Sequence, residues 1–213
     1  QMAQADDYPD VVIGCAGGGS NMAGLVIPFI REAREKNLGT RFLAAEPTAC
    51  PSMTRGVHTY DFGDTVGMTP LVKMHTLGHD FMPPGIHAGG LRYHGMAPLM
   101  SLLHEEGIVE AQSYHQNAIF EAAVQFARSE GIIPAPESAH AIRAAIEEAL
   151  EAKEAGQERV ILFNLSGHGH FDMASYDAYF EGQLEDYEYP QEAVQAAQAR
   201  MPRVDETAIM GGG

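Results

Sequence analysis

The sequence has few cysteines, few basic residues and no long hydrophobic run, and each scarcity argues against a class of protein. Only Cys15 and Cys50 are present among 213 residues, so we infer no disulfide framework and expect a reducing, cytoplasmic compartment. No apolar run approaches the roughly 20 residues of a membrane span. The first seven residues are polar and acidic, unlike a signal peptide. Neither a membrane protein nor a secreted, disulfide-rich protein is expected.

Positive charge is also scarce, because 13 Lys and Arg residues stand against 29 Asp and Glu residues, a formal net charge of −16. Nucleic-acid binding depends on basic side chains that neutralise phosphates, so no nucleic-acid partner is expected. A small anion held by backbone N–H groups is still compatible with this charge. Hydrophobic residues make up 45% of the chain, enough to bury a core, so wholesale disorder is not expected.

Hydrophobic patterning predicts an α/β protein with an open, mostly parallel twisted sheet and flanking helices. Apolar runs typical of strands buried on both faces occur at 10–15, 41–47 and 159–164. Helical periodicity occurs at 21–37, 98–105, 113–129 and 138–155, the third with a capping box from Ser113 to Gln116. The first strand, helix and second strand make a βαβ unit, which requires parallel strands.

Three parts are predicted along the chain: a polar lead-in at 1–9, an α/β domain at 10–175, and a solvated acidic C-terminal extension at 176–213 with a flexible glycine tail. Within the domain, residues 50–99 are rich in glycine, proline and histidine without sustained periodicity. Such a stretch predicts a long functional loop region with short elements. Because the chain opens abruptly into a strand and has no initial Met, we expect it to be a fragment.

The sharpest chemical feature lies between the first strand and the first helix, in the run Gly17, Gly18, Gly19, Ser20 and Asn21. Glycines let the backbone approach a ligand closely and leave its N–H groups unobstructed. The helix adds its positive N-terminal end, and the serine and asparagine side chains add donors. The run predicts a cradle for a phosphate, and a plain glycine-rich turn is the alternative.

Two nucleotide-binding motifs do not fit this loop. A Walker loop requires Gly-Lys-Ser/Thr, and no lysine lies in or near the run. A dinucleotide fingerprint requires Gly-x-Gly-x-x-Gly, whereas residues 14–19 read GCAGGG. Glu46, at the end of the second strand, nevertheless resembles the ribose-binding acid of dinucleotide-binding folds. A nucleotide-binding domain therefore stays open as an alternative.

Two further segments carry candidate ligand groups. Glu137 follows a stiff proline turn and begins a helix, where the helix dipole stabilises a carboxylate, so an ordinary N-terminal acid is equally compatible. Ser166 lies at the carboxyl end of a predicted strand, the edge where ligands gather in open α/β sheets. It is either a ligand donor or a turn residue.

The sequence favours neither a metal site nor a hydrolase. The chain has ten histidines, and the pairs His75/His79 and His168/His170 are closely spaced. A helix could bring the first pair to one face, but a glycine separates them and no cysteine accompanies them, so no metal is predicted. The sequence contains no Gly-x-Ser-x-Gly elbow, so a hydrolase is set aside.

In their order, these motifs resemble the tryptophan synthase β chain and its relatives among fold-type II pyridoxal-phosphate (PLP) enzymes. The resemblance covers residues 10 to about 180 and rests on four segments: CAGGGSN at 15–21, HAGGL at 87–91, GIIPAPESAH at 131–140 and NLSG at 164–167. LRYHG at 91–95 and HGHFD at 168–172 are more similar to the second, divergent class of β chains, which also carries a longer C-terminus.

The resemblance implies that residues 10–175 bind the phosphate of PLP in a lyase that converts L-serine and indole to L-tryptophan by β-replacement. The run 17–21 would hold the phosphate. Gly90 would line the pyridine ring, Glu137 would lie beside it, and Ser166 would hydrogen-bond its nitrogen. A neutral serine leaves that nitrogen unprotonated, which favours β-elimination and replacement over transamination.

In the resembling family the Schiff-base lysine lies upstream of the phosphate loop. This chain has only Lys36, Lys73 and Lys153, none of which matches that motif. The resemblance therefore implies the C-terminal half of the enzyme, inactive alone, with the lysine supplied by an upstream half from the same gene or a separate chain. A homodimer and a tryptophan synthase α subunit are implied partners. Two alternatives stay open: another PLP β-eliminase such as a serine deaminase, and a non-catalytic phosphate-ligand or regulatory module.

Overall fold

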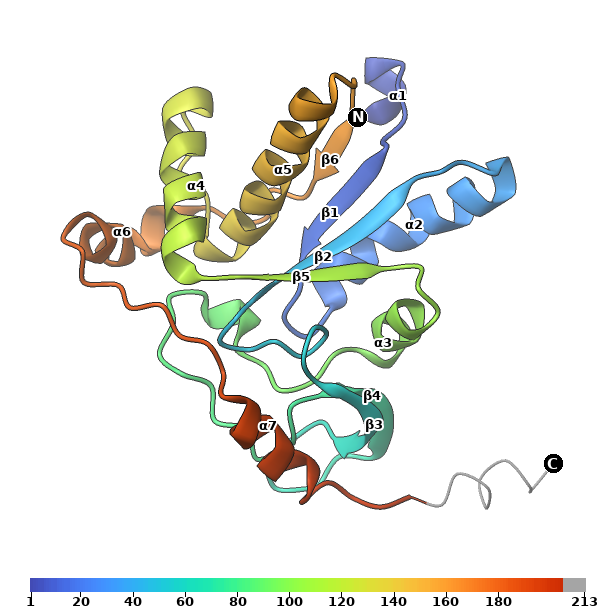
Figure 1. Cartoon of the computed structure of the whole chain (residues 1–213), viewed down its shortest axis with the longest axis vertical. Coiled ribbons are helices and arrows are strands. Elements are labelled where there is room, and N and C mark those ends of the chain that lie inside the picture. The colour runs from blue at the N-terminus through green and yellow to red at the C-terminus, as the bar shows by residue number, and fades with distance from the viewer. Residues whose placement is uncertain (205–213) are drawn as a thin grey trace.

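The structure, a computed structural model, describes residues 1–204, and its centre is a sheet of four parallel strands (Figure 1). The strands stand in the order β5-β2-β1-β6 and comprise β1 (Val11–Cys15), β2 (Arg41–Pro47), β5 (Glu110–Tyr114) and β6 (Ile161–Phe163). The predicted α/β fold with a mostly parallel sheet is confirmed. No helix among the described residues is long and apolar enough to cross a membrane.

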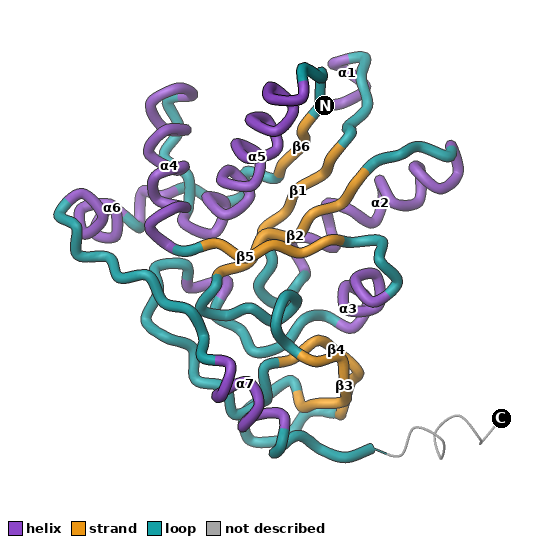
Figure 2. Tube along the Cα trace, viewed as in Figure 1, coloured by secondary structure: helices purple, strands orange, loops and turns teal. Residues whose placement is uncertain are grey.

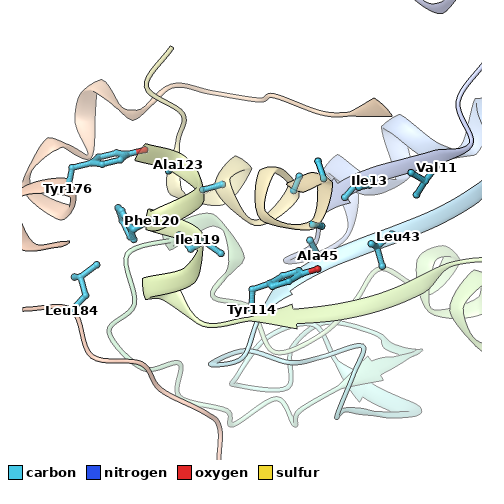
Figure 3. Close-up of a cluster of buried hydrophobic side chains, with 14 residues drawn as sticks. Val11, Ile13, Leu43, Ala45, Tyr114, Ile119, Phe120, Ala123, Tyr176 and Leu184 are labelled. Atoms are coloured by element: carbon cyan, nitrogen blue, oxygen red, sulfur yellow. The ribbon is translucent and has the colours of Figure 1, made fainter. Parts of the chain in front are cut away.

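Helices cover both faces of the sheet because successive side chains of its central strands point to opposite sides. Val11 and Ile13 face a cluster with α4 (Gln116–Glu130) and α5 (Pro136–Ala155), part of which Figure 3 shows. Val12 instead packs in a second cluster with α2 (Ser20–Lys36) and α3 (Pro98–Glu105). A strand buried on both faces must be apolar throughout, which is why it reads as a continuous run.

The region 50–99 contains more regular structure than its sequence predicts. It holds an antiparallel hairpin of β3 (Val57–Phe62) and β4 (Leu71–Thr76), and a short 3-10 helix, η1 (Gly89–Leu91). The hairpin is separate from the main sheet and packs beside α3 (Figure 2). Its strands are mostly half-buried and mix charged, histidine and apolar residues, so they lack the apolar run that marks the central strands.

The predicted helix at 113–129 is wrong at its start. Residues 110–114 form the edge strand β5, in which Ser113 pairs with Glu46 of β2, and α4 begins at Gln116 after the N-cap His115. The predicted capping box is therefore not formed. As an edge strand, β5 is partly exposed and polar, and its sequence lacks the apolar run that predicts β1, β2 and β6.

The two ends of the chain, predicted as a polar lead-in and a solvated acidic extension, both contain helices. Residues 1–9 include the short helix α1 (Met2–Ala5), and the C-terminal part contains η2 (Gly169–Phe171), α6 (Met173–Phe180) and α7 (Gln191–Gln198). Tyr176, Leu184 and Val194 are buried against the rest of the protein, so the expectation of a solvated extension is wrong for them. The predicted glycine tail lies outside the described residues. The division into three parts stays a prediction.

Candidate functional site

The glycine loop presents a row of unused backbone donors at the N-terminus of α2. Among residues 1–204, no group accepts a hydrogen bond from the N–H of any residue from Gly17 to Asn21. The first turn of α2 contains no acidic residue, and no side chain caps it. Gly18 and Ser20 are exposed, so a ligand can reach the loop from solvent. This arrangement suits an anion, which N–H groups and the helix dipole both stabilise.

Two of the loop glycines are required by close backbone approach. A Cβ on Gly17 would lie 2.6 Å from the carbonyl oxygen of Gly90 and 2.8 Å from the Cα of Leu91. Gly19 has φ = 92°, which other residues rarely adopt, and a Cβ there would lie 2.5 Å from the Sδ of Met96. The turn at 89–91 therefore packs directly against the loop, and residues with side chains cannot replace these glycines without movement.

Glu137 and Gly90, which are far apart in the sequence, meet beside the loop. The Gly90 N–H donates to Glu137 Oε1 at 2.8 Å, from the first turn of α5. Half-buried Glu137 is thereby fixed next to the turn at 89–91, in which Gly89 and Gly90 are exposed. The structure thus brings Gly17, Gly90 and Glu137 into one group.

A second group links the helix start to the end of β6. Asn21 Nδ2 donates to Ser166 Oγ at 3.0 Å, and Asn164 Nδ2 donates to Asn21 Oδ1 at 3.1 Å. The Ser138 hydroxyl donates to the Ser166 carbonyl oxygen and holds the segment that follows β6. Ser166 Oγ accepts a hydrogen bond from an amide and keeps its own proton to donate, and Ser138 Oγ lies 3.4 Å from it.

Cys15 lies under these groups and is not a nucleophile at neutral pH. Its Sγ donates to Asn21 Oδ1 at 3.8 Å. Burial, with a smaller contribution from the Glu137 charge, raises the pKa of the thiol to about 11. Reactivity requires the thiolate, so Cys15 serves as a small, buried packing residue.

All the residues predicted for the site lie around the carboxyl ends of β1 and β6 and the N-termini of α2 and α5, where open α/β sheets bind ligands. Their individual roles toward a cofactor stay predictions. Sequence reasoning missed Ser138, because a serine at a helix start is more often a cap, and it missed Asn164 as a partner of Asn21. The only indication in the sequence is that these two residues lie next to, or two residues from, the predicted site residues Glu137 and Ser166.

Glu46 does not lie in this site. It is fully buried and accepts hydrogen bonds from the N–H groups of Met53 and Thr54, at 3.0 and 2.8 Å, and from the Thr54 hydroxyl at 2.6 Å. Burial raises the pKa of its carboxyl despite these bonds. Glu46 therefore holds the turn after β2 and cannot reach a ribose, so the nucleotide-binding alternative loses its key residue.

The three lysines lie outside the glycine loop and its surroundings. Two are in the last turns of helices, and the third is on the hairpin. Lys36 pairs with Glu32 in the last turn of α2, and Lys153 lies in the last turn of α5. Lys73 is on β4, with its Nζ 5.8 Å from the centre of the Tyr60 ring. None belongs to the N-terminal ends of α2 and α5, which carry the site.

His140, in α5 close to Glu137, is fully buried and is expected to make stability depend on pH. Its Nδ1 donates to the Pro136 carbonyl oxygen at 2.9 Å, and no described residue hydrogen-bonds its Nε2. Burial lowers the pKa of His140 from 6.5 to about 4, so the folded state resists protonation that the unfolded state accepts. The resulting stabilisation of about 3 kcal/mol is present above about pH 6.5 and is lost as the pH falls toward 4.

Urea denaturation at about pH 7 and about pH 4.5 measures this dependence. His140→Asn keeps an amide donor near Nδ1 but does not titrate, so its loss of unfolding free energy over this interval should be about 2–3 kcal/mol smaller than that of the wild type. Equal losses in the two proteins would show that His140 is not the group responsible.

Comparisons with known protein families and with known sequences point to the same family. Residues 1–167 match the family described as "Pyridoxal-phosphate dependent enzyme". The tryptophan synthase beta chain 2 of Methanosarcina mazei is 65% identical over 185 residues, which are 87% of this chain and 42% of that protein. The proteins of the same name from Aeropyrum pernix and Aquifex aeolicus are each 60% identical, over 88% and 87% of this chain and 42% and 44% of theirs. The chain thus spans less than half the length of these relatives.

Solved structures resemble the fold at much lower identity. A fungal L-serine ammonia-lyase from Rhizomucor miehei superposes with a TM-score of 0.62 at 14% identity, covering 86% of this chain and 53% of that one. A threonine deaminase from T.th. gives a TM-score of 0.53 at 20% identity, covering 80% and 53%. These likenesses establish the fold and carry no argument about substrate.

Proposed function

Because the chain belongs to the pyridoxal-phosphate dependent enzyme family, we propose that it is the C-terminal, phosphate-binding part of a tryptophan synthase β-like lyase. The whole enzyme, of fold type II, would join L-serine and indole into L-tryptophan in amino-acid biosynthesis. The observation that carries the proposal is the row of five backbone N–H groups, Gly17 to Asn21, that no described residue uses.

The residues present fit PLP. Its phosphate is a small dianion, and the loop offers backbone donors, a helix N-terminus and the Ser20 hydroxyl without an acidic residue in the first helical turn. When bound, PLP supplies an electron sink for a carbanion next to the amino group of the substrate. The chain's own contribution is to hold the phosphate and to set the electronic state of the ring.

Ser166 would set that electronic state through its hydroxyl. Asn21 donates to Ser166 Oγ at 3.0 Å, so the hydroxyl keeps a proton that it would offer to the ring nitrogen of bound PLP. A serine that donates requires an unprotonated acceptor, which favours β-elimination and replacement over transamination. Glu137, engaged at 2.8 Å by the Gly90 N–H, would lie beside the ring, and Gly90 would line it.

The lysine that binds the cofactor would come from an upstream half of the enzyme, in the same chain or in a second one. Lys36, Lys73 and Lys153 lie outside the site, which supports this division of labour. We further propose that the whole β chain is a homodimer, acts in the cytoplasm and can pair with a tryptophan synthase α subunit. The chain alone should not turn over.

A reconstitution experiment tests the proposal. The chain is produced alone, and also together with the segment that its reading frame encodes upstream, and each sample receives PLP, L-serine and indole. Only the combination should show the visible absorbance of lysine-bound PLP and form L-tryptophan. Ser166→Asp in the combination should retain PLP but form tryptophan at least about tenfold more slowly, since an aspartate favours a protonated ring nitrogen.

Two results decide against the proposal. The absence of that absorbance in every mixture would favour the alternative of a non-catalytic phosphate-binding module, which the lack of a suitably placed lysine also suggests. Release of pyruvate from serine, with no tryptophan formed from indole, would instead identify a serine deaminase-like β-eliminase. The 60–65% identity to tryptophan synthase β chains supports the lyase over this second candidate.

A further inference from the structure

A cluster of imidazole and carboxylate groups lies away from the glycine loop, where the hairpin meets α3. His58 of β3 and His75 of β4 are directly opposed in the antiparallel register, and their rings stack at 5.1 Å between centres. Glu105, the last residue of α3, reaches both, with Oε2 3.6 Å from His58 Nδ1 and Oε1 2.8 Å from His75 Nε2. One ligand atom from each of the three residues lies within 4.8 Å of the others.

His75 is the unusual member of this cluster. Its residue is only 5% exposed, yet neither ring nitrogen has a hydrogen-bond partner among the described residues. The short approach of Nε2 to Glu105 lacks hydrogen-bond geometry, although the two atoms are 2.8 Å apart. A buried imidazole without partners is costly, and a bound ion is one way in which native proteins satisfy such a group.

We propose that His58, His75 and Glu105 bind a divalent transition-metal cation, with Zn²⁺ as the best match. Zinc binds histidine nitrogen and carboxylate oxygen at about 2.0–2.2 Å, so two donors at the tetrahedral angle lie about 3.4 Å apart. The observed separations of 2.8 and 3.6 Å fall on either side of that value. Two imidazoles and one carboxylate are ligands suited to zinc, and they leave a fourth position open to solvent.

The surroundings support a cation at this place. Glu105 is 45% exposed and provides an open side through which an ion can enter. His104, whose ring packs edge-on against His75, has its Nδ1 bonded to the Val109 carbonyl oxygen at 2.7 Å and is not one of the three ligands.

The metal would join two elements that lie far apart in the sequence. His58 and His75 belong to the hairpin, and Glu105 is the last residue of α3. At the other end of α3, the N-cap Ala97 donates its N–H to the carbonyl oxygen of Gly18 in the glycine loop. A cation at the Glu105 end of α3 would therefore fasten the hairpin to the helix that supports the loop. This site is independent of the proposed catalytic function.

Equilibrium dialysis of the tag-free, full 213-residue chain against ZnCl₂ tests the proposal, with Co²⁺ absorbance as a report on the ligands. We expect one Zn²⁺ per chain and a tetrahedral Co²⁺ spectrum. His58→Asn and His75→Gln should abolish both, and Glu105→Gln should weaken zinc at least about tenfold, since even losses outside the ligand set cost about 10–100-fold. Glu105 is half-exposed, so its variant remains informative even if a histidine variant fails to fold.

Two controls separate this site from adventitious binding to other side chains. Glu106→Gln makes the same charge change one residue away, on an exposed side chain, and His170→Gln removes an exposed histidine whose ring lies 4.7 Å from His168. Both should bind zinc as the wild type does. The absence of stoichiometric binding, binding that survives Glu105→Gln and His58→Asn undiminished, or binding lost in His170→Gln would each overturn the proposal.

Discussion

Glu148→Gln is expected to lower the free energy of unfolding by about 3–5 kcal/mol, because it breaks a buried ion-pair network. Glu148 is only 4% exposed on α5 and accepts two hydrogen bonds from Arg41 Nη1, at 2.9 and 3.0 Å. Arg159 donates to the same carboxylate and, at 3.3 Å, to the Glu148 carbonyl oxygen. The substitution keeps the shape but removes the buried negative charge that both guanidinium groups share, and leaves Arg41 paired with Glu110 alone.

The network matters because it joins α5 to the two strands on either side of β1. Arg41 is the first residue of β2, and Arg159 lies just before β6. Glu148 lies in α5, the helix whose first turn carries the site residues Glu137 and Ser138. Urea denaturation measures the loss. Glu151→Gln is the matched control, since Glu151 is 67% exposed and 3.7 Å from Arg159, so its effect should stay within about 0.5 kcal/mol. Similar losses in both variants would show that the network is not the cause.

The sequence predicts the two central strands, whose residues are almost all buried, and misses three strands whose burial is mixed. Residues 11–15 and 42–45 lie in the centre of the sheet, so every position there is apolar or small, and the sequence identifies both segments as strands. The edge strand β5 and the hairpin strands β3 and β4 are partly exposed. Apolar and polar residues do not alternate regularly along them. Local patterns cannot specify such strands, because their stability depends on the strands they pair with.

The candidate site shows the same division between local and long-range information. The run 17–21 is a local signal, because a strand, a tight turn and a helix start are all encoded within a few residues. The contacts of Gly90 with Glu137 and of Asn21 with Ser166 span 47 and 145 residues, and only folding creates them. Glu46 shows the opposite case, in which a local signal misleads. Its position at a strand end suggests a contact with a ribose, whereas its carboxylate accepts hydrogen bonds from the turn that follows the strand.

Gly17→Ala is expected to lower the affinity of the assembled enzyme for PLP by about 100-fold, the size of effect that a 1 Å misplacement of binding groups can cause. The added Cβ would lie 2.6 Å from the Gly90 carbonyl oxygen and 2.8 Å from the Leu91 Cα. Both are backbone atoms, so the clash cannot be relieved by turning a side chain. Either the loop or the turn at 89–91 must move, and the unfolding free energy should also fall by about 1–3 kcal/mol.

The matched control is Gly24→Ala, the same chemical change a few residues further along, inside α2. No atom lies within 4 Å of a Cβ at Gly24, so the alanine should raise the unfolding free energy by about 0.5–1 kcal/mol and leave cofactor affinity unchanged. Titration of the assembled protein with PLP, followed by its visible absorbance, measures both variants against the wild type. If Gly17→Ala bound PLP as tightly as Gly24→Ala, the close packing of the loop on residues 89–91 could not be what aims its N–H groups at the phosphate.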